Sequence, residues 1–248
     1  MKLNKGDVTT ALIDADIMLY RACWKHEGEE VELAYETIDA MFEHIFYVTK
    51  CLNYIGFLTG RDNFRKEIAV TKEYKGNRKD MPLPEHFDNV RQYLTKEWGC
   101  KVVDGIEADD ALGICQTELD KTIICSIDKD LLQIEGLHYN WNNNEVSFVN
   151  QHDANRLVHK QTLMGDSTDN IVGIPRVGKV KAEKILSGGE MEDSYEDICM
   201  NAYKEHFEDE NEALAKFKET LDLVYIARSP KDERFKEVFE IPEPMYVF

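Results

Sequence analysis

The sequence predicts an α/β protein, with a central, mainly parallel sheet flanked by helices and a smaller helical region after it. Short apolar runs alternate with segments of helical periodicity up to residue 150. Beyond that point the pattern is mostly helical, with a glycine-containing break at 165–178. We therefore expect a core domain over 1–150 and a helical domain over 151–248.

The expected strands are short and rich in β-branched and aromatic residues, and they lie at 9–13, 54–58, 101–103, 122–127, 137–141 and 145–149. The last two flank three asparagines, which is typical of a hairpin. Apolar residues at helical spacing predict helices over 33–52, 85–97 and 108–119. Parallel strands joined by helices place their carboxyl ends at one edge of the sheet, where ligands collect.

The composition is that of a globular protein, with 43% hydrophobic and 31% charged residues. No apolar run is long enough to cross a membrane, and the first residues lack the apolar core of a signal peptide. Six cysteines occur without any CxxC pair, which excludes a zinc ribbon and indicates reduced thiols in a cytosol.

The net charge of −18 argues against a nucleic-acid partner, but the distribution of charge reverses that impression. Residues 60–101 carry ten basic and seven acidic side chains, and residues 171–189 carry four and one. The stretch between them, 102–170, carries four basic and thirteen acidic side chains. The basic islands could hold an anion such as DNA while the acidic centre binds cations, although solvated surface charge explains the same pattern.

Carboxylates follow the expected strands and should converge at one sheet edge: Asp14, Glu107, Asp109, Asp110, Asp128 and Asp130. Gathered carboxylates repel one another unless divalent cations neutralise them, and hard oxygen ligands suit Mg²⁺ or Mn²⁺. The alternative for Asp109 and Asp110 is capping, since acidic residues favour the first turn of a helix.

A second acidic pair, Asp166 and Asp169, lies within residues 163–186, and the GIPRVGKVKA core of this segment resembles a helix–hairpin–helix turn. Its glycines let backbone amides approach a phosphate. Three lysines stand in the helix that follows the turn: Lys179, Lys181 and Lys184.

Five motifs occur in an order that resembles the flap endonuclease/5′→3′ exonuclease family: LIDAD, EYKGNR, GIEADD, SIDKD and MGDSTDN with GIPRVG. The chain is similar to the free-standing bacteriophage members, over residues 10–190. The resemblance implies a PIN-like 5′-nuclease core, a helical arch in the basic region 61–101 and a helix–hairpin–helix region. It also implies a monomer in the host bacterial cytoplasm that acts in phage DNA replication, recombination or repair.

The implied activity is cleavage of phosphodiesters near 5′ ends, nicks and flaps of DNA by two Mg²⁺ or Mn²⁺ ions, with RNA:DNA hybrids as a further substrate. The matching ligands on the first-site side are Asp14, Glu107, Asp109, Asp128 and Asp130. On the second-site side they are Asp110, Asp166 and Asp169. By the same resemblance, backbone carbonyls of the turn hold K⁺, namely those of Leu163, Met164, Val172, Ile174 and Val177.

The resemblance also assigns roles to residues outside the carboxylate set. Lys75 and Arg78 match basic residues that orient the scissile phosphate, and Arg21 matches another arginine on the phosphate side. Tyr74 would stack on a base, with half-buried packing as the alternative, and Lys179, Lys181 and Lys184 would contact DNA.

One departure concerns the second strand, where the family often carries a carboxylate and this chain has Gly60. Asp62 or a water is the expected substitute. Asp16 makes LIDAD similar to the DxD of haloacid-dehalogenase phosphatases, but the other motifs have no place there, so Asp16 is interpreted as peripheral. The remaining alternatives are a DNA-binding protein without turnover and a PIN-like ribonuclease.

Overall fold

The computed structural model describes residues 3, 6–188 and 194–247, and they divide into two units. The sheet unit comprises residues 1–63, 82–149 and 226–248, and the helical unit comprises 64–81 and 150–225. One division falls between 149 and 150, and the expected division falls between 150 and 151. Two segments differ from the expected division, because 64–81 group with the helical unit and 226–248 with the sheet unit.

The sheet unit is built on a seven-stranded sheet in the order β3-β2-β1-β4-β5-β6, with β9 paired to β2. The strands are β1 (Thr10–Asp14), β2 (Asn53–Thr59), β3 (Lys101–Val103), β4 (Thr122–Cys125), β5 (Gly136–Asn140), β6 (Glu145–Val149) and β9 (Met245–Tyr246). Strands β3, β2, β1, β4 and β5 run parallel, whereas β6 and β9 are antiparallel. The mainly parallel sheet is confirmed.

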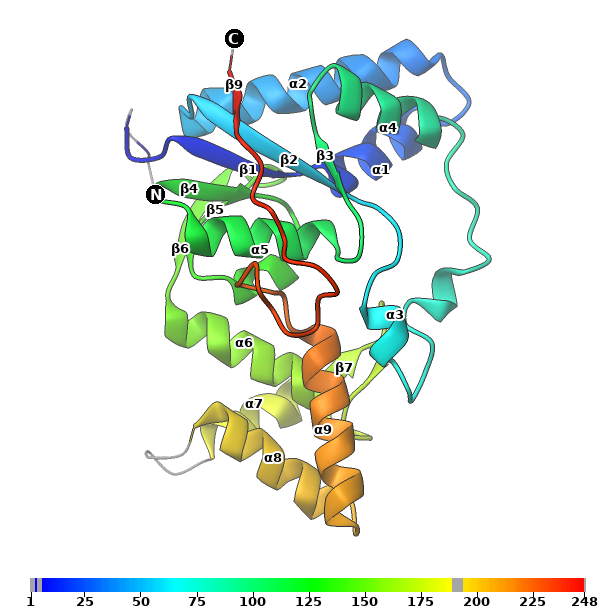
Figure 1. The fold of residues 1–248 in the computed structure, drawn as a ribbon, viewed down its shortest axis with the longest axis vertical. Coiled ribbons are helices and arrows are strands. Elements are labelled where there is room, and N and C mark those ends of the chain that lie inside the picture. Colours follow the sequence, from blue (N-terminus) through cyan, green and yellow to red (C-terminus); the bar gives the residue numbers. More distant parts are fainter. Residues whose placement is uncertain (1–2, 4–5, 189–193, 248) are drawn as a thin grey trace. The chain divides into compact units, whose positions relative to one another are not determined.

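Helices cover both faces of this sheet (Figure 1). One face carries α1 (Ala15–Lys25), α2 (Val31–Thr49) and α4 (Phe87–Lys96), and the other carries α5 (Ala108–Glu118). A short helical turn, η2 (Asp130–Gln133), follows β4. The central strands are apolar because both of their faces are buried. Helix α1 was not expected from the sequence, since its apolar residues follow β1 without a break.

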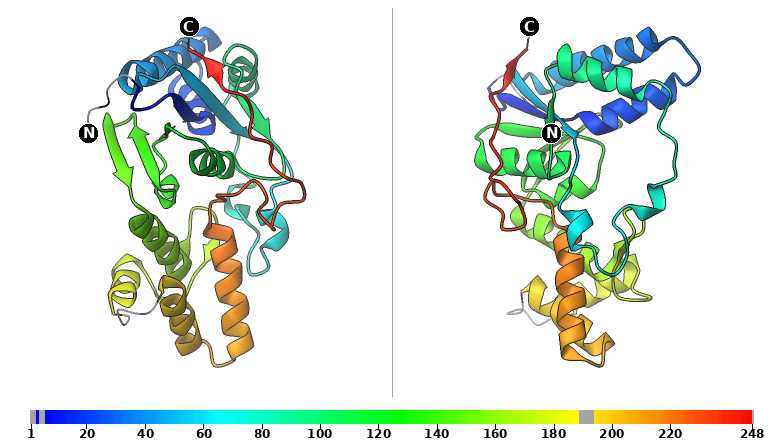
Figure 2. Two further views of the ribbon diagram at one scale, coloured as in Figure 1. Left: turned by 60° about the vertical axis from the view of Figure 1, so that its left-hand side comes forward. Right: turned by 45° about the vertical axis from the view of Figure 1, so that its right-hand side comes forward.

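The helical unit contains α6 (Gln151–Met164), α7 (Lys179–Ser187), α8 (Tyr195–His206) and α9 (Glu210–Val224). A two-stranded ladder of β7 (Gly165–Asp166) and β8 (Ile171–Val172) lies between α6 and α7. The segment 64–81 contributes α3 (Arg65–Ile68) and η1 (Gly76–Arg78) to this unit. Figure 2 shows the chain from two further sides, with the short α3 and the longer α9 both visible.

A core around Tyr203 and Phe217 holds the helical unit together, with Leu163 and Ala182 packed into it. All six cysteines are buried and free of disulfides, as expected. Among the described residues, no helix is both long and apolar enough to cross a membrane.

Candidate active site

Asp14 is a buried strand-end carboxylate, with 2% of its surface exposed. It ends β1 and caps α1, where one of its oxygens accepts a hydrogen bond from Ile17 N at 3.2 Å. Its other oxygen accepts from the Ser126 hydroxyl at 2.6 Å. Burial raises the pKa of Asp14 to about 7, and the charges of Asp16 and Asp128 add to that rise.

Ser126 joins Asp14 to the turn that carries Asp128 and Asp130. Its hydroxyl accepts from Asp128 N at 2.9 Å, and Asp128 Oδ1 accepts from Asp130 N at 2.8 Å. Because β1 and β4 are neighbours in parallel register, Ile13 lies opposite Cys125 and the two strand ends meet. Ser126 was missed by the sequence reasoning, although it opens the SIDKD motif.

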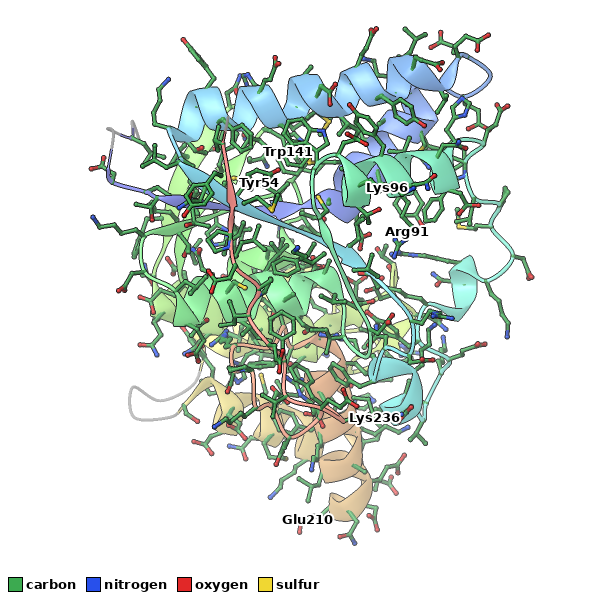
Figure 3. All side chains as sticks on the ribbon, turned by 45° about the horizontal axis from the view of Figure 1, so that its top comes forward. Tyr54, Arg91, Lys96, Trp141, Glu210 and Lys236 are labelled. Atoms are coloured by element: carbon green, nitrogen blue, oxygen red, sulfur yellow. The ribbon has the colours of Figure 1, made fainter. Side chains whose placement is uncertain are left out.

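Asp16 belongs to the same electrostatic environment, contrary to its interpretation as peripheral. Its carboxylate accepts from Thr59 N at 2.9 Å, and Arg91 donates to the carbonyl of Thr59 at 2.8 Å (Figure 3). Burial raises the pKa of Asp16, and the nearby charge of Glu107 raises it further, while Arg91 opposes the rise. The feature of the sequence that could have indicated this is the position of Asp16, two residues after Asp14.

Asp110 acts as a helix cap and is fully buried. Its oxygens accept from Glu107 N at 3.0 Å and from Ala227 N at 3.0 Å. Glu107 and Asp110 form a reciprocal capping box at the start of α5, and Asp109 lies in the same first turn. The structure therefore gives Asp110 the capping role that was the alternative, and metal ligation by these three residues stays a prediction.

Gly60 follows β2, and the space that a side chain would take there is already filled. A Cβ on Gly60 would lie 2.1 Å from Asp104 Oδ1 and 2.6 Å from the carbonyl oxygen of Val103. The same oxygen of Asp104 accepts from Arg61 N at 2.6 Å. The carboxylate beside this position thus comes from the end of β3, whereas Asp62 is exposed with φ of 59°.

These carboxylates are not gathered into a preformed cage. In the part of the chain that the structure describes, no group of three or more His, Cys, Asp or Glu side chains is close enough to hold a metal ion. The hydrogen bonds to Ser126 and to backbone amides account for the positions of Asp14 and Asp110. Mutual repulsion disfavours any closer approach of like charges.

The helical unit brings together the basic motif EYKGNR and the acidic motif MGDSTDN. Asp169 Oδ1 accepts from Arg78 at 2.7 Å, and its other oxygen lies 3.7 Å from the ammonium nitrogen of Lys75. Lys75 N also donates to the backbone carbonyl of Asp169 at 2.9 Å. Asn77 and Asn170 bond backbone carbonyls of the opposite motif, so residues 73–78 and 167–170 form one hydrogen-bonded body.

Tyr74 is 4% exposed and packs with Ile171, Leu223 and Val224. Its hydroxyl donates to Asp169 Oδ2 at 3.1 Å. This environment corresponds to the packing alternative, and stacking of Tyr74 on a base stays a prediction.

Glu219 of α9 holds the segment that leads to Lys75. Its carboxylate accepts from Val70 N at 2.7 Å, from Thr71 N at 2.5 Å and from the Thr71 hydroxyl. Lys216 donates to the same hydroxyl at 2.6 Å. The sequence gave no signal for this contact, because nearly 150 residues separate its two sides.

The turn between α6 and α7 depends on two glycines. A Cβ on Gly165, whose φ is 69°, would lie 2.4 Å from Gly173 N, and one on Gly173 would lie 2.3 Å from Gly165 N. This close approach lets Ile174 N donate to the carbonyl of Leu163 at 2.9 Å. A cavity of about 500 Å³ is lined by four of the five residues whose carbonyls were expected to hold K⁺: Met164, Val172, Ile174 and Val177.

The lysines after this turn lie on the exposed surface of α7. Between them, Glu183 pairs with Lys160 at 2.9 Å and also with Arg156, both of α6. Glu183 is therefore neutralised within the helical unit. Lys179, Lys181 and Lys184 remain as exposed cations of α7, to which the sequence reasoning had assigned DNA contact.

The chain thus combines a mainly parallel sheet, with carboxylates at its carboxyl edge, and a helical unit with a glycine turn. A model of the family described as 5′-3′ exonuclease, N-terminal resolvase-like domain, matches residues 9–163. The chain belongs to this family.

Several curated relatives carry the description 5′-3′ exonuclease, among them two proteins from Buchnera aphidicola. The protein from Buchnera aphidicola of Acyrthosiphon pisum is 33% identical over 158 residues, 57% of this chain and 54% of its own length. The protein from the Baizongia pistaciae strain is 27% identical over 224 residues, 80% of this chain and 72% of its own. The chain thus spans about half the length of the first of these relatives.

Solved structures share the fold at low sequence identity. The bacteriophage T5 flap endonuclease, in a pseudo-enzyme–product complex with DNA and metal ions, has a TM-score of 0.61 at 15% identity. The match covers 88% of this chain and 90% of that one. The catalytic core of Rad2, in complex with DNA substrate, has a TM-score of 0.55 at 15% identity over 97% and 83% of the chains.

Proposed function

We propose that this protein is a divalent-metal-dependent 5′→3′ exonuclease with flap endonuclease activity on DNA. The observation that carries the proposal is the strand-end group around Asp14, Ser126 and Asp128, in a chain that belongs to the 5′-3′ exonuclease family. The buried carboxylate of Asp14 has no cation beside it in its hydrogen bonds, so a bound cation would relieve its cost of burial.

The donor set fits Mg²⁺ or Mn²⁺. It consists of carboxylate oxygens, and the cysteines that a softer metal would prefer are buried in the core. We propose Asp14, Glu107, Asp109, Asp128 and Asp130 as first-site ligands, with Asp110 extending the site. For Asp166 and Asp169, metal ligation stays a prediction from the sequence. Asp104 would replace the carboxylate that the family often carries at the position of Gly60, and it would contact the metal ion through a water molecule. Two divalent ions would supply an activated water and charge neutralisation for the departing oxygen.

The chain's own residues would position the substrate. Lys75 and Arg78 would hold the scissile phosphate, since guanidinium and ammonium groups stabilise charge that develops on phosphate oxygens. Lys75 and Arg78 both pair with Asp169, so a substrate phosphate would compete with the Asp169 carboxylate for these two cations. Arg21 would hold a phosphate farther along the strand.

Duplex DNA would bind at the glycine turn and at Lys179, Lys181 and Lys184. Carbonyls of the turn residues would hold K⁺ between the protein and a DNA phosphate, as oxygen rings do for this ion elsewhere. The proposal extends to RNA:DNA hybrids as substrates, a monomeric protein and a role in phage DNA replication.

The test is incubation of the purified protein with 5′-labelled flap DNA. We expect cleavage in Mg²⁺ or Mn²⁺, none in excess EDTA, and loss to the assay background in Asp128→Ala with the fold intact by circular dichroism. Substantial cleavage in EDTA would contradict the two-metal mechanism. Binding of flap DNA without cleavage in any divalent metal would favour the alternative of a DNA-binding protein without turnover. This alternative is suggested by Gly60, which stands where the family often carries a carboxylate.

A further inference from the structure

A pocket of about 560 Å³ opens in the sheet unit between α1, α2 and the β5–β6 turn. Helix α1 contributes Arg21 and Lys25, and α2 contributes Met41 and His44. Trp141, labelled in Figure 3, reaches the pocket from the turn after β5. Apart from Arg21, no residue of this pocket belongs to the motifs discussed above.

The two permanent cations of the pocket lack charged partners. Both terminal nitrogens of Arg21 donate to Asn142 Oδ1 at 3.2 Å, and Lys25 donates to the Thr37 hydroxyl at 3.2 Å. Both acceptors are neutral, and within residues 3, 6–188 and 194–247 neither cation forms an ion pair. In a chain of net charge −18, this leaves an unusual local excess of positive charge.

The remaining titratable groups do not reverse this excess. Glu36 is the carboxylate among the described lining residues. His26 also lines the pocket, with its Nδ1 2.5 Å from Glu29. His44 Nε2 lies 2.7 Å from Asn144 Oδ1. The pocket therefore favours an anion, and the planar guanidinium of Arg21 suits a phosphate.

The pocket is also lined by apolar side chains, those of Leu33, Ala40, Met41 and Trp141. A ligand that joins a phosphate to a flat, weakly polar surface would use both kinds of lining residue, and a nucleotide is such a ligand. Bases stack on aromatic side chains without regard to sequence, and the volume lies within the range of small-ligand pockets.

The pocket also lies at the edge of the sheet that carries the candidate site. Arg21 comes seven residues after Asp14, about 10 Å along the helix axis at the usual rise. Trp141 directly follows β5, which runs parallel to β4 and so ends at the same edge.

We propose that this pocket binds one nucleotide of a single-stranded segment of the nucleic-acid substrate. Its phosphate lies against Arg21 and Lys25, and its base packs on Met41 and Trp141. This inference rests on the proposed function in one respect, that the substrate is a strand of nucleic acid. It does not depend on cleavage, because binding at the pocket requires none.

The test is fluorescence anisotropy of a labelled ten-residue oligothymidylate and a blunt duplex, in EDTA and over a range of salt concentrations. The variants are Lys25→Ala and Met41→Glu. The matched control is Lys50→Ala, since Lys50 lies at the end of α2 over the ring of Tyr47 and outside the pocket. Thermal melting checks that each variant folds.

We expect Met41→Glu to weaken oligothymidylate binding roughly tenfold or more, the scale of one lost stacked base. Lys25→Ala should make the slope of log K against log salt shallower by about 0.7, the value for one phosphate of a single strand. Duplex binding should be unchanged in both variants, and the control should match the parent.

Two results would overturn the inference: unchanged oligothymidylate binding in both folded variants, or an equal loss for oligothymidylate and duplex. Competition adds a third, because thymidine monophosphate binding as tightly as the oligomer would identify a site for free nucleotides. Since the measurement is made without divalent ions, a protein that binds the oligomer here but cleaves no flap contradicts the proposed function alone.

Discussion

Two carboxylates, Asp14 of the sheet unit and Asp169 of the helical unit, have opposite electrostatic surroundings. In the sheet unit, Asp14 is buried with only a hydroxyl and an amide as hydrogen-bond donors, and the pKa of Asp14 rises to about 7. In the helical unit, Asp169 lies between two cations, Lys75 and Arg78. The first carboxylate needs a positive charge from outside the protein, whereas the second is neutralised from within.

This difference separates two tasks. A buried carboxylate such as Asp14, whose hydrogen-bond donors are uncharged, keeps its affinity for added cations, at the cost of stability when none is bound. A cation pair that is already ordered on a carboxylate is pre-organised before a phosphate arrives. Substitutions in the two units should therefore affect different measurements.

The largest effect is expected for Lys75→Ala. If Lys75 stabilises charge in the transition state, the single-turnover rate of flap cleavage should fall roughly 10²–10³-fold. Arg78 still holds Asp169 in this variant, so the fold should persist. Affinity for flap DNA in Ca²⁺, measured by anisotropy, should fall much less. An affinity loss as large as the rate loss would make Lys75 a docking residue.

Asp14→Asn should stabilise the metal-free protein. A raised pKa of Asp14 means that the unfolded chain ionises first, so the folded state loses stability as pH rises from about 4 to about 7. The neutral variant escapes this loss, on the order of a few kcal/mol. Melting in EDTA should show a higher Tm than the parent at pH 8 and a smaller gain at pH 4. Equal gains at both pH values would contradict burial of a charge.

Asp104→Asn tests whether the carboxylate beside Gly60 supports the metal site. We expect Mn²⁺ affinity, measured by electron paramagnetic resonance titration, to fall about 10–100-fold, the usual cost of losing a residue that acts on a metal through water. Asp62→Asn is the matched control, since Asp62 is two residues from Gly60 but exposed. A loss in the control with none in Asp104→Asn would reverse the assignment.

Glu219→Gln should have a smaller effect, through the segment that carries Lys75. The amide oxygen can still accept from Val70 N and Thr71 N, but it has no charge to strengthen these bonds, and the NH₂ group cannot accept from the Thr71 hydroxyl. We expect trypsin to cut after Lys72 several-fold faster and the single-turnover rate to fall a few-fold, with KM nearly constant. Glu212→Gln, at the start of the same helix, is the control. Unchanged proteolysis would exclude this positioning role.

The smallest effect is expected for the exposed lysines of α7. Lys179→Ala with Lys181→Ala should weaken duplex binding and make the salt slope shallower by about 1.8, near 0.9 for each lost phosphate contact. The rate of cleavage at saturating enzyme should stay the same. An unchanged salt slope would show that Lys179 and Lys181 do not contact DNA.

The sheet was predictable because each central strand is a short apolar run bounded by polar residues. Residues 101–103 and 145–149 coincide with observed strands, and the others agree within a few residues. Strand β9 was not predictable, since two residues near the end of a polar segment carry no periodic signal. Helix α1 was missed because its apolar residues merge with those of β1.

The candidate site was predictable in part for similar reasons. Carboxylates at strand ends follow from strand positions, so Asp14 and Asp128 were found. Asp104 and Ser126 were missed because their roles depend on which strands are neighbours, which only the fold determines. Glu219 lies nearly 150 residues from its partners, beyond any local pattern.

The return of the last segment to the sheet has a consequence for synthesis on the ribosome. Residues 226–248 supply both the amide that bonds Asp110 and a strand that pairs with β2. The helical unit has its complete sequence once Tyr225 is made, whereas the sheet unit lacks these contacts until residues 226–248 have followed. During translation α7 can therefore form before Asp110 receives its hydrogen bond from Ala227 N.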